Sequence, residues 1–236
     1  MHRSDIAPRT GNNLLDRVPA PDRQRLLDSA QLVSFEARDE VDGLRWPEQP
    51  VYFPISGVYS LLLPMKEETA VEVAVVDSEG MLGIPIVLGM NENPVRAVAQ
   101  VAGQCLRVPQ ERFLASLRES EPLDALVRRF LAVSWQTANQ NIACNLRHTV
   151  KERTCRWFLS VDDRSPSDEF TVTQEVLGGL IGASRQKMTT VIGELEASGF
   201  IQHRRGRVRI LDREGIETTC CECYRLLRKA YVFLTS

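Results

Sequence analysis

The chain has 236 residues, of which 43% are hydrophobic and 25% are charged, a composition typical of a globular protein with room for two domains. No apolar run approaches the ~20 residues of a membrane span, and the first residues, MHRSDIAPRTGNN, lack a signal peptide's apolar core, so we expect a cytoplasmic protein with no membrane partner. The formal net charge of the chain is −2. Residues 147–236, however, hold 15 of the 29 Lys and Arg and only 12 of the 31 Asp and Glu, so this part is positively charged. A positive charge favours a nucleic acid as its partner.

The N-terminal half is predicted to be mainly β-structure. Residues 1–13 are polar and are expected to be a disordered start, and one or two short helices follow over 14–30. Short strand-like segments then alternate with turn residues, and Lys66-Glu67-Glu68 is expected at a hairpin tip. At least five short strands within about 80 residues predict an all-β roll or sandwich. The segments are LVSFEA, VYFPISG, VYSLLLPM, AVEVAVV, PVRAVAQVAG and QCLRVP.

A glycine-containing turn interrupts this β-region at residues 77–83, DSEGMLG. Its two glycines permit a tight turn and would let a ligand approach backbone N–H groups, while a nearby arginine could pair with a phosphate. A purely structural turn between strands has the same pattern, so both interpretations stay open. The candidate effector-pocket residues are Gly80, Met81, Leu82, Gly83, Arg96 and Ala97.

A long helix is predicted over residues 121–147, after a short one over 111–118. Apolar and small residues recur along it at spacings of 4, 3, 4, 3 and 4, which is typical of a coiled-coil seam and predicts pairing with a second subunit. The alternative is that the helix packs on the β-region, and apolar residues on several faces would allow both. The seam is Leu126, Phe130, Val133, Thr137, Gln140 and Cys144, and its first four residues are the expected dimer interface.

The helical pattern restarts after Arg147. Thr149 and Glu152 have the T-x-x-E spacing of a capping box, and the new helix runs through Trp157 to a polar linker over 162–168. A capped break between two helices predicts a hinge. The expected domains are therefore a β-roll over 14–120, a dimerisation helix over 121–147 and a C-terminal domain over 148–236.

A helix-turn-helix is predicted over residues 172–201, whose sequence is VTQEVLGGLIGASRQKMTTVIGELEASGFI. Two segments with helical apolar faces flank Gly182, which is expected to turn the backbone through positive φ, and Ser184 is expected to cap the second helix. An ordinary helical hairpin with a solvated polar face is the alternative. The first apolar face comprises Val176, Leu177, Leu180 and Ile181, and the second comprises Met188, Val191, Ile192 and Leu195.

The second helix would present base-reading chemistry on its outer face. Arg can donate two bonds to guanine and Gln can exchange two with adenine, while Lys can reach a phosphate. The following QHRRGRVRILDR predicts a β-hairpin wing with a basic tip that lies along the DNA backbone. The expected DNA-contacting residues are Thr173, Ser184, Arg185, Gln186, Lys187, Thr189, Thr190, Arg205 and Arg207.

This order of parts resembles the Crp/Fnr superfamily of bacterial transcription regulators, most specifically at EGMLG, IGASRQ and RGRVRILDREGIE. The resemblance implies an α+β fold with an N-terminal cyclic-nucleotide-binding-like β-roll, a long dimerisation helix and a C-terminal winged helix-turn-helix. It also implies a homodimer that binds inverted repeats in double-stranded DNA and contacts RNA polymerase. Arg185 would then read a guanine in each half-site. Gln186 and Thr190 stand where members carry a glutamate and an arginine, so the operator is expected to differ.

The glycine turn departs from the cyclic-AMP-binding members that it resembles. Those are expected to carry an acid after the first glycine and a Ser or Thr after the arginine, whereas this chain has Met81 and Ala97. Cyclic AMP is therefore not expected to control the protein. No cofactor is expected, and the effector is unknown.

The six cysteines raise the question of redox or metal chemistry. The first is Cys105, so the N-terminal cysteine cluster of iron–sulfur members has no counterpart. Cys220, Cys221 and Cys223 would diverge on a helix with no histidine nearby in sequence, so we predict buried thiols and no metal site. An enzyme is not expected either, because no nucleophile–base pair is evident. The alternatives are a redox- or gas-responsive regulator, or a signalling protein whose C-terminal part docks protein.

Overall fold

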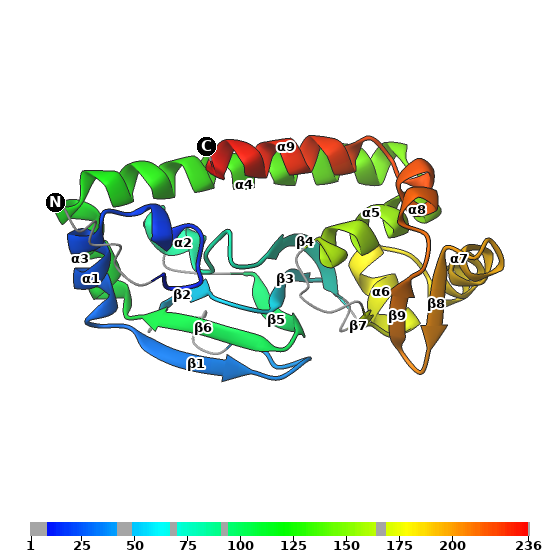
Figure 1. Cartoon of the computed structure of the whole chain (residues 1–236), viewed down its shortest axis with the longest axis horizontal. Helices are drawn as coiled ribbons and strands as arrows, with labels where there is room; N and C mark the ends of the chain where they lie inside the picture. Colours follow the sequence, from blue (N-terminus) through cyan, green and yellow to red (C-terminus); the bar gives the residue numbers. More distant parts are fainter. Residues whose placement is uncertain (1–8, 42–48, 67–69, 91–93, 164–168, 236) are drawn as a thin grey trace, which may run out of the picture.

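The computed structural model describes residues 9–41, 49–66, 70–90, 94–163 and 169–235. It has a β-domain at one end and a helical domain with a small sheet at the other, and the long helix α4 (Glu121–Arg147) spans both. The C-terminal helix α9 (Cys223–Thr235) lies beside α4 and runs in the opposite direction (Figure 1). Among the helices that the structure describes, none combines the length and apolar character of a membrane span.

The β-domain consists of two three-stranded antiparallel sheets, ordered β1-β6-β2 and β4-β3-β5. All four residues of β2 are buried, and Phe53 of that strand stacks edge-on against Phe113 of α3, which anchors the helix to the sheet. All six strand segments expected from the sequence are present. Their bounds are β1 Gln31–Phe35, β2 Val51–Pro54, β3 Val58–Pro64, β4 Ala70–Val76, β5 Arg96–Val101 and β6 Gly103–Val108.

Short helices close the open end of the roll. The two elements expected within 14–30 are a 3-10 helix, η1 (Leu15–Arg17), and α1 (Ala20–Leu27). The α3 helix (Gln110–Glu119) begins after Pro109, and α2 (Ile84–Val87) follows the glycine turn. Four-residue helices have almost no periodic signal, so the sequence did not predict α2.

The start of the described chain is packed, contrary to the expectation of disorder over 1–13. Asn12 is fully buried, and its side-chain amide donates to the backbone oxygens of Pro54 (2.7 Å) and Gly80 (3.0 Å). A polar residue here therefore stabilises the fold by satisfying two buried carbonyls. Residues 1–8 of that segment lie outside the described residues, as do Glu67 and Glu68 of the expected hairpin tip.

Helix α4 occupies the predicted range, but its seam faces inward. Ser120 caps it by accepting a bond from the Leu123 N–H (3.3 Å). Phe130 is 2% exposed, and its ring lies so close to Gly80 that a Cβ there would be 2.7 Å from it. The four residues expected at the dimer interface are thus covered by their own chain, because the roll and α9 pack on this face; they are Leu126, Phe130, Val133 and Thr137.

The opposite face of α4 carries exposed apolar residues. Trp135, Ile142 and Leu146 are 73%, 61% and 79% exposed. At 100° per residue they lie within about 40° of one another and about 180° from the centre of the buried seam. The helix therefore has two apolar faces, of which the chain itself covers one.

A second helix begins after a two-residue break. Thr149 accepts from the Glu152 N–H and the Glu152 carboxylate accepts from the Thr149 N–H, so the capping box is confirmed. Helix α5 (Val150–Asp162) buries Trp157 and Phe158 in the core of the C-terminal domain, where both rings contact Phe170. The α5 helix ends at the first residue of the linker expected over 162–168, and residues 164–168 lie outside the described residues.

The rest of the C-terminal domain has the expected winged helix-turn-helix order. The β7 strand (Glu169–Thr171) adds to the wing hairpin to give the sheet order β7-β9-β8, and its three residues were too few to predict. The remaining elements are α6 (Gln174–Ile181), α7 (Arg185–Ala197), β8 (Ile201–Arg204), β9 (Arg207–Ile210) and α8 (Arg213–Thr219).

Candidate nucleic-acid interface

The turn between α6 and α7 is built on glycine at two positions. Gly182 has φ 70°, the left-handed conformation expected from the sequence. Gly178 lies so close to the turn that a Cβ would be 2.7 Å from the backbone oxygen of Ala183. The Ala183 N–H also donates to the Gly178 oxygen at 2.8 Å. These contacts hold the two helices at short range and fix the direction in which α7 leaves the turn.

The start of α7 presents its polar side chains to solvent. Ser184 caps the helix by accepting from the Lys187 N–H (3.2 Å), as expected. The inward face is fully buried, and it comprises Met188, Val191, Ile192 and Leu195. The outward side chains of the first two turns are all exposed, and they are Arg185, Gln186, Lys187, Thr189 and Thr190.

All four of the expected DNA-contacting hydroxyls already have partners within the domain, Ser184 through the cap described above. Thr173 is half-buried and caps α6 by accepting from the Val176 N–H (3.2 Å). The Thr189 hydroxyl bonds Gln174 Oε1 at 2.8 Å and so joins α7 to the first residue of α6, a link that the sequence did not reveal. The Thr190 hydroxyl donates to the Gln186 backbone oxygen (3.2 Å). Arg185, Gln186 and Lys187 are therefore the side chains best placed to reach a base or phosphate.

The wing is a tight hairpin with a basic tip. Arg205 and Gly206 have φ of 51° and 77°, and positive φ at both central residues is typical of a two-residue hairpin turn. The tip rests on the rest of the domain, because the Val172 N–H donates to the Gly206 oxygen at 2.7 Å. Arg207 donates to Glu169 of β7 (3.0 Å), so part of its guanidinium is already engaged in an ion pair.

The candidate effector turn is filled by its own side chains. Met81, Leu82 and Ala97 have no exposed surface, and Gly80 and Gly83 are also buried. Arg96 is bound by Glu40, whose Oε1 accepts from the Arg96 Nε at 3.0 Å. That ion pair raises the pKa of Arg96 above its ordinary value.

Backbone groups of the same turn are used within the fold. The Gly80 N–H donates to the Asp77 oxygen (3.1 Å), and Leu82 exchanges two backbone bonds with Tyr52 (2.8 and 3.1 Å). A phosphate held by these N–H groups would have to displace those bonds. The structural interpretation of the turn is therefore the one that its contacts support.

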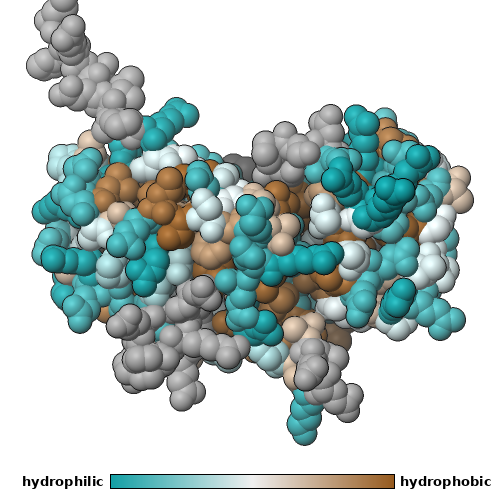
Figure 2. All heavy atoms as spheres, turned by 90° about the horizontal axis from the view of Figure 1, so that it is seen from below, coloured by the Kyte–Doolittle hydropathy of each residue, from teal (hydrophilic) through white to brown (hydrophobic). Residues whose placement is uncertain are grey.

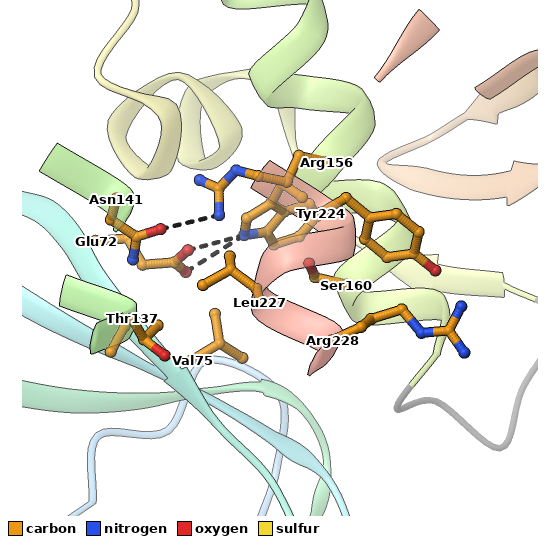
Figure 3. A pocket seen from close by; sticks show the side chains of 11 residues that line it. Glu72, Val75, Thr137, Asn141, Arg156, Ser160, Tyr224, Leu227 and Arg228 are labelled. Carbon is orange, nitrogen blue, oxygen red and sulfur yellow. Dashed lines mark hydrogen bonds between the residues drawn. The ribbon is translucent and has the colours of Figure 1, made fainter. Parts of the chain in front are cut away.

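A hollow between the two domains was not evident from the sequence. It is lined by side chains of β4, α4, α5 and α9, and Figure 3 shows them converging. The Trp157 indole N–H donates to both carboxylate oxygens of Glu72 (3.1 and 3.3 Å), and the Arg156 guanidinium donates to Asn141 (3.0 Å). These bonds tie α5 to the β-domain and to α4.

A second hollow lies where α6 meets the β-domain. Its wall includes Leu62 and Ala70 of the roll and Val176 and Leu180 of α6. Val176 is 37% exposed here and does not lie in the buried apolar face that the sequence predicted for α6. In Figure 2, hydrophilic side chains gather at the end that carries the winged domain, whereas apolar atoms are seen between the two halves.

The described residues include one group with metal-ligand chemistry, namely Cys144, His148, Cys221 and Cys223. The sequence did not reveal this group, because its members are far apart along the chain. His148 and Cys144 lie at the end of α4, which the turn before α9 contacts in space.

Comparison with known families supports the interpretation of the C-terminal domain. The model of the Crp-like helix-turn-helix domain matches residues 152–219. These residues form a Crp-like helix-turn-helix domain. The match contains α6, α7 and the wing, together with most of α5 and all of α8. No curated protein matches the chain significantly.

Solved structures extend the likeness to the whole fold. A putative Crp/Fnr-family regulator from Eubacterium rectale has 15% identity and a TM-score of 0.68, over 89% of this chain and 99% of that one. FixK2 from Bradyrhizobium japonicum has 14% identity and a TM-score of 0.69, over 81% of this chain and 98% of its own. The c-di-GMP-responsive regulator CLP from Xanthomonas campestris has 18% identity and a TM-score of 0.66, over 81% of this chain and 99% of its own. The α+β fold and the resemblance to Crp/Fnr regulators are thus confirmed.

Arg213 ties the Crp-like domain together at its base. It bonds Asp162, Asp163 (2.5 Å), Glu217 (3.0 Å) and the hydroxyl of Tyr224 (2.8 Å). Partial burial disfavours its charge, but the hydrogen bond and charge of Asp163 outweigh this effect and raise the pKa of Arg213. One guanidinium thus connects the ends of α5, α8 and α9.

Proposed function

We propose that the protein is a sequence-specific DNA-binding transcription regulator, with α7 as its recognition helix and the β8–β9 hairpin as its wing. The single observation that carries the proposal is the Crp-like domain with Arg185, Gln186 and Lys187 exposed together on the first turn of a capped, well-supported helix. This is the part of a recognition helix that meets base edges in the major groove. The wing tip adds positive charge beside it.

The proposed regulator acts as a homodimer through the exposed face of α4. Trp135, Ile142 and Leu146 form an apolar stripe on a helix whose other face is already packed. Such a stripe supports pairing with a second copy, since the same helix of the partner offers a matching face. Dimerisation would place two recognition helices on one duplex, and inverted repeats are then the expected operators. RNA polymerase is the expected protein partner of a bound dimer, on the resemblance alone, and a cytoplasmic location fits this role.

Cyclic AMP is not the proposed effector. Two polar groups expected for the nucleotide are replaced by Met81 and Ala97, both fully buried, and Arg96 is already paired with Glu40. Each unmet hydrogen-bond partner in a buried site costs about 1–3 kcal/mol, so two together cost roughly 2–6 kcal/mol. At 1.4 kcal/mol per tenfold, the affinity would fall by about thirty-fold to over ten-thousand-fold.

Selection of random duplex DNA by the purified protein, followed by gel shift, tests the proposal. Enrichment of an inverted repeat is expected, with the same affinity whether or not cyclic AMP is present. Failure to enrich any sequence would contradict DNA recognition. A gain in operator affinity on adding cyclic AMP would contradict only the part that concerns the effector turn.

A further inference from the structure

Four side chains with metal-ligand atoms meet where the end of α4 contacts the turn into α9. Cys144 lies in the last turn of α4, and His148 directly follows that helix. Cys223 is the first residue of α9, and Cys221 precedes it by two residues. Their ligand atoms all lie within 4.8 Å of one another. Two separate segments, 77 residues apart at Cys144 and Cys221, thus contribute two ligand groups each.

Two of the six spacings match the edges of a small tetrahedron, and the other four are at most 4.8 Å. Cys144 Sγ is 3.6 Å from Cys221 Sγ, and Cys223 Sγ is 3.6 Å from His148 Nδ1. Zinc bonded to sulfur at about 2.3 Å and to nitrogen at about 2.0–2.1 Å gives tetrahedral edges of about 3.8 Å between sulfurs and about 3.6 Å between sulfur and nitrogen. The observed distances agree with both edges, whereas a disulfide would bring the sulfurs to about 2.05 Å.

Outer contacts orient two of the four groups. His148 Nε2 lies 3.1 Å from Glu222 Oε2, which leaves Nδ1 facing the thiols. A carboxylate on the far nitrogen fixes the imidazole's tautomer and orientation in many metal sites. Gln140 Nε2 donates to Cys223 Sγ at 3.0 Å and so holds this side chain in position.

Burial and charge also suit a closed site. Cys144, Cys221 and Cys223 are at most 4% exposed, while His148 is only half-buried and gives an ion a route inward. Three thiolates, a neutral imidazole and Zn²⁺ carry a net charge of only −1. Cys220 is not one of the four, because its thiol lies against the Cys221 backbone oxygen at 3.4 Å.

We propose that Cys144, His148, Cys221 and Cys223 bind one zinc ion per chain in a Cys3His site that joins the end of α4 to the start of α9. Thiolate and imidazole in tetrahedral arrangement select zinc over the oxygen-preferring cations. Binding releases the three thiol protons, and the imidazole coordinates as its neutral form. With four protein ligands the site is structural, and it stands whether or not the chain binds DNA.

The test uses the full-length, untagged protein purified without chelators. Mass spectrometric metal analysis is expected to find about one zinc per chain, and cobalt exchange is expected to give the ligand-field and sulfur charge-transfer absorption of tetrahedral thiolate coordination. Absence of zinc both as purified and after incubation with zinc under reducing conditions would overturn the proposal. So would a Cys144–Cys221 disulfide found by peptide mapping after handling under reducing conditions.

Variants separate ligation from general effects on the fold. Cys144→Ser and Cys221→Ser are expected to lose stoichiometric zinc, whereas Cys220→Ser, in the adjacent position, keeps it. Glu222→Gln alters a largely exposed side chain and is expected to weaken zinc binding 10- to 100-fold in a competition with a chromophoric chelator, a range typical of losing a carboxylate that orients a metal-bound histidine. This variant keeps the test valid if a cysteine variant fails to fold. Equal zinc loss in Cys220→Ser, or unchanged affinity in Glu222→Gln, would contradict the assignment.

Discussion

Glu72 in β4 accepts the indole N–H of Trp157 in α5, with 3.1 and 3.3 Å to its two carboxylate oxygens (Figure 3). The two residues are 85 positions apart, and the bond crosses from the β-domain to the Crp-like domain. A hydrogen bond to a charged acceptor in a partly buried place is among the stronger ones that proteins make. This pair is therefore a defined point at which the two halves are coupled.

Removing the carboxylate is expected to loosen the domains without unfolding either. Glu72→Ala leaves the indole N–H without this acceptor, a loss of about 1.5–3 kcal/mol. Amide hydrogen exchange should then increase in α5 and in α6, which contacts β4, and stay unchanged in the buried face of α7. Glu111→Ala, at an exposed position of α3, is the control. Identical exchange in Glu72→Ala and the control would show that the bond does not couple the domains.

Sequence preference is expected to depend on Arg185 and general affinity on the wing. Arg185→Ala removes a two-bond base contact worth about 1–3 kcal/mol per half-site and should relax the selected operator. Arg205→Asn is the matched wing variant, because Asn tolerates the positive φ at this position, and it should weaken all sequences alike and lower the salt dependence. Binding titrations on the operator and a scrambled duplex at several salt concentrations measure both effects. Full operator preference in Arg185→Ala would mean that another element reads the bases.

The exposed stripe of α4, rather than its buried seam, is expected to hold the dimer. Trp135→Glu places a charge at the centre of the proposed interface and should shift sedimentation toward the monomer with the fold intact. Gln136→Glu, one residue on and also exposed, should remain dimeric. Phe130→Ala should instead lower the stability of the chain by about 3–5 kcal/mol, as for other buried aromatics. A dimeric Trp135→Glu protein would place the interface elsewhere.

Loss of the guanidinium at position 213 is expected to destabilise the Crp-like domain. Arg213→Ala leaves Asp162 and Asp163 close together without their common cation, although Asp163 keeps the bond from the Tyr224 hydroxyl. Each partner lost in this way costs about 1–3 kcal/mol, reduced here by solvent. The melting temperature should fall by several degrees. Arg128→Ala, which removes one exposed ion pair of α4, should change it little. Equal shifts in both variants would show that the Arg213 cluster contributes no more than a surface pair.

The parts of the fold that were predicted from the sequence depend on local chemistry. The capping box at Thr149 and Glu152 and the glycine turn at Gly182 are fixed by residues a few positions apart, and the strands by their alternation. The covered face of α4 could not be predicted, because both faces are apolar and only the packing of distant elements decides between them. The contact between Cys144 and Cys221 has the same origin, since no local pattern records that α9 returns along α4.

That return path constrains how the winged domain can move. The chain enters the domain from the end of α4 at residues 147–150, and α9 brings it back against α4 directly after α8. A body attached at two nearby points loses most of its rotational degrees of freedom and keeps chiefly the rotation about the line that joins them. Opening of the Glu72–Trp157 contact would therefore rotate the winged domain about this line and move the recognition helix along a single arc. In a dimer, the distance between the two recognition helices would then be set by this one rotation angle.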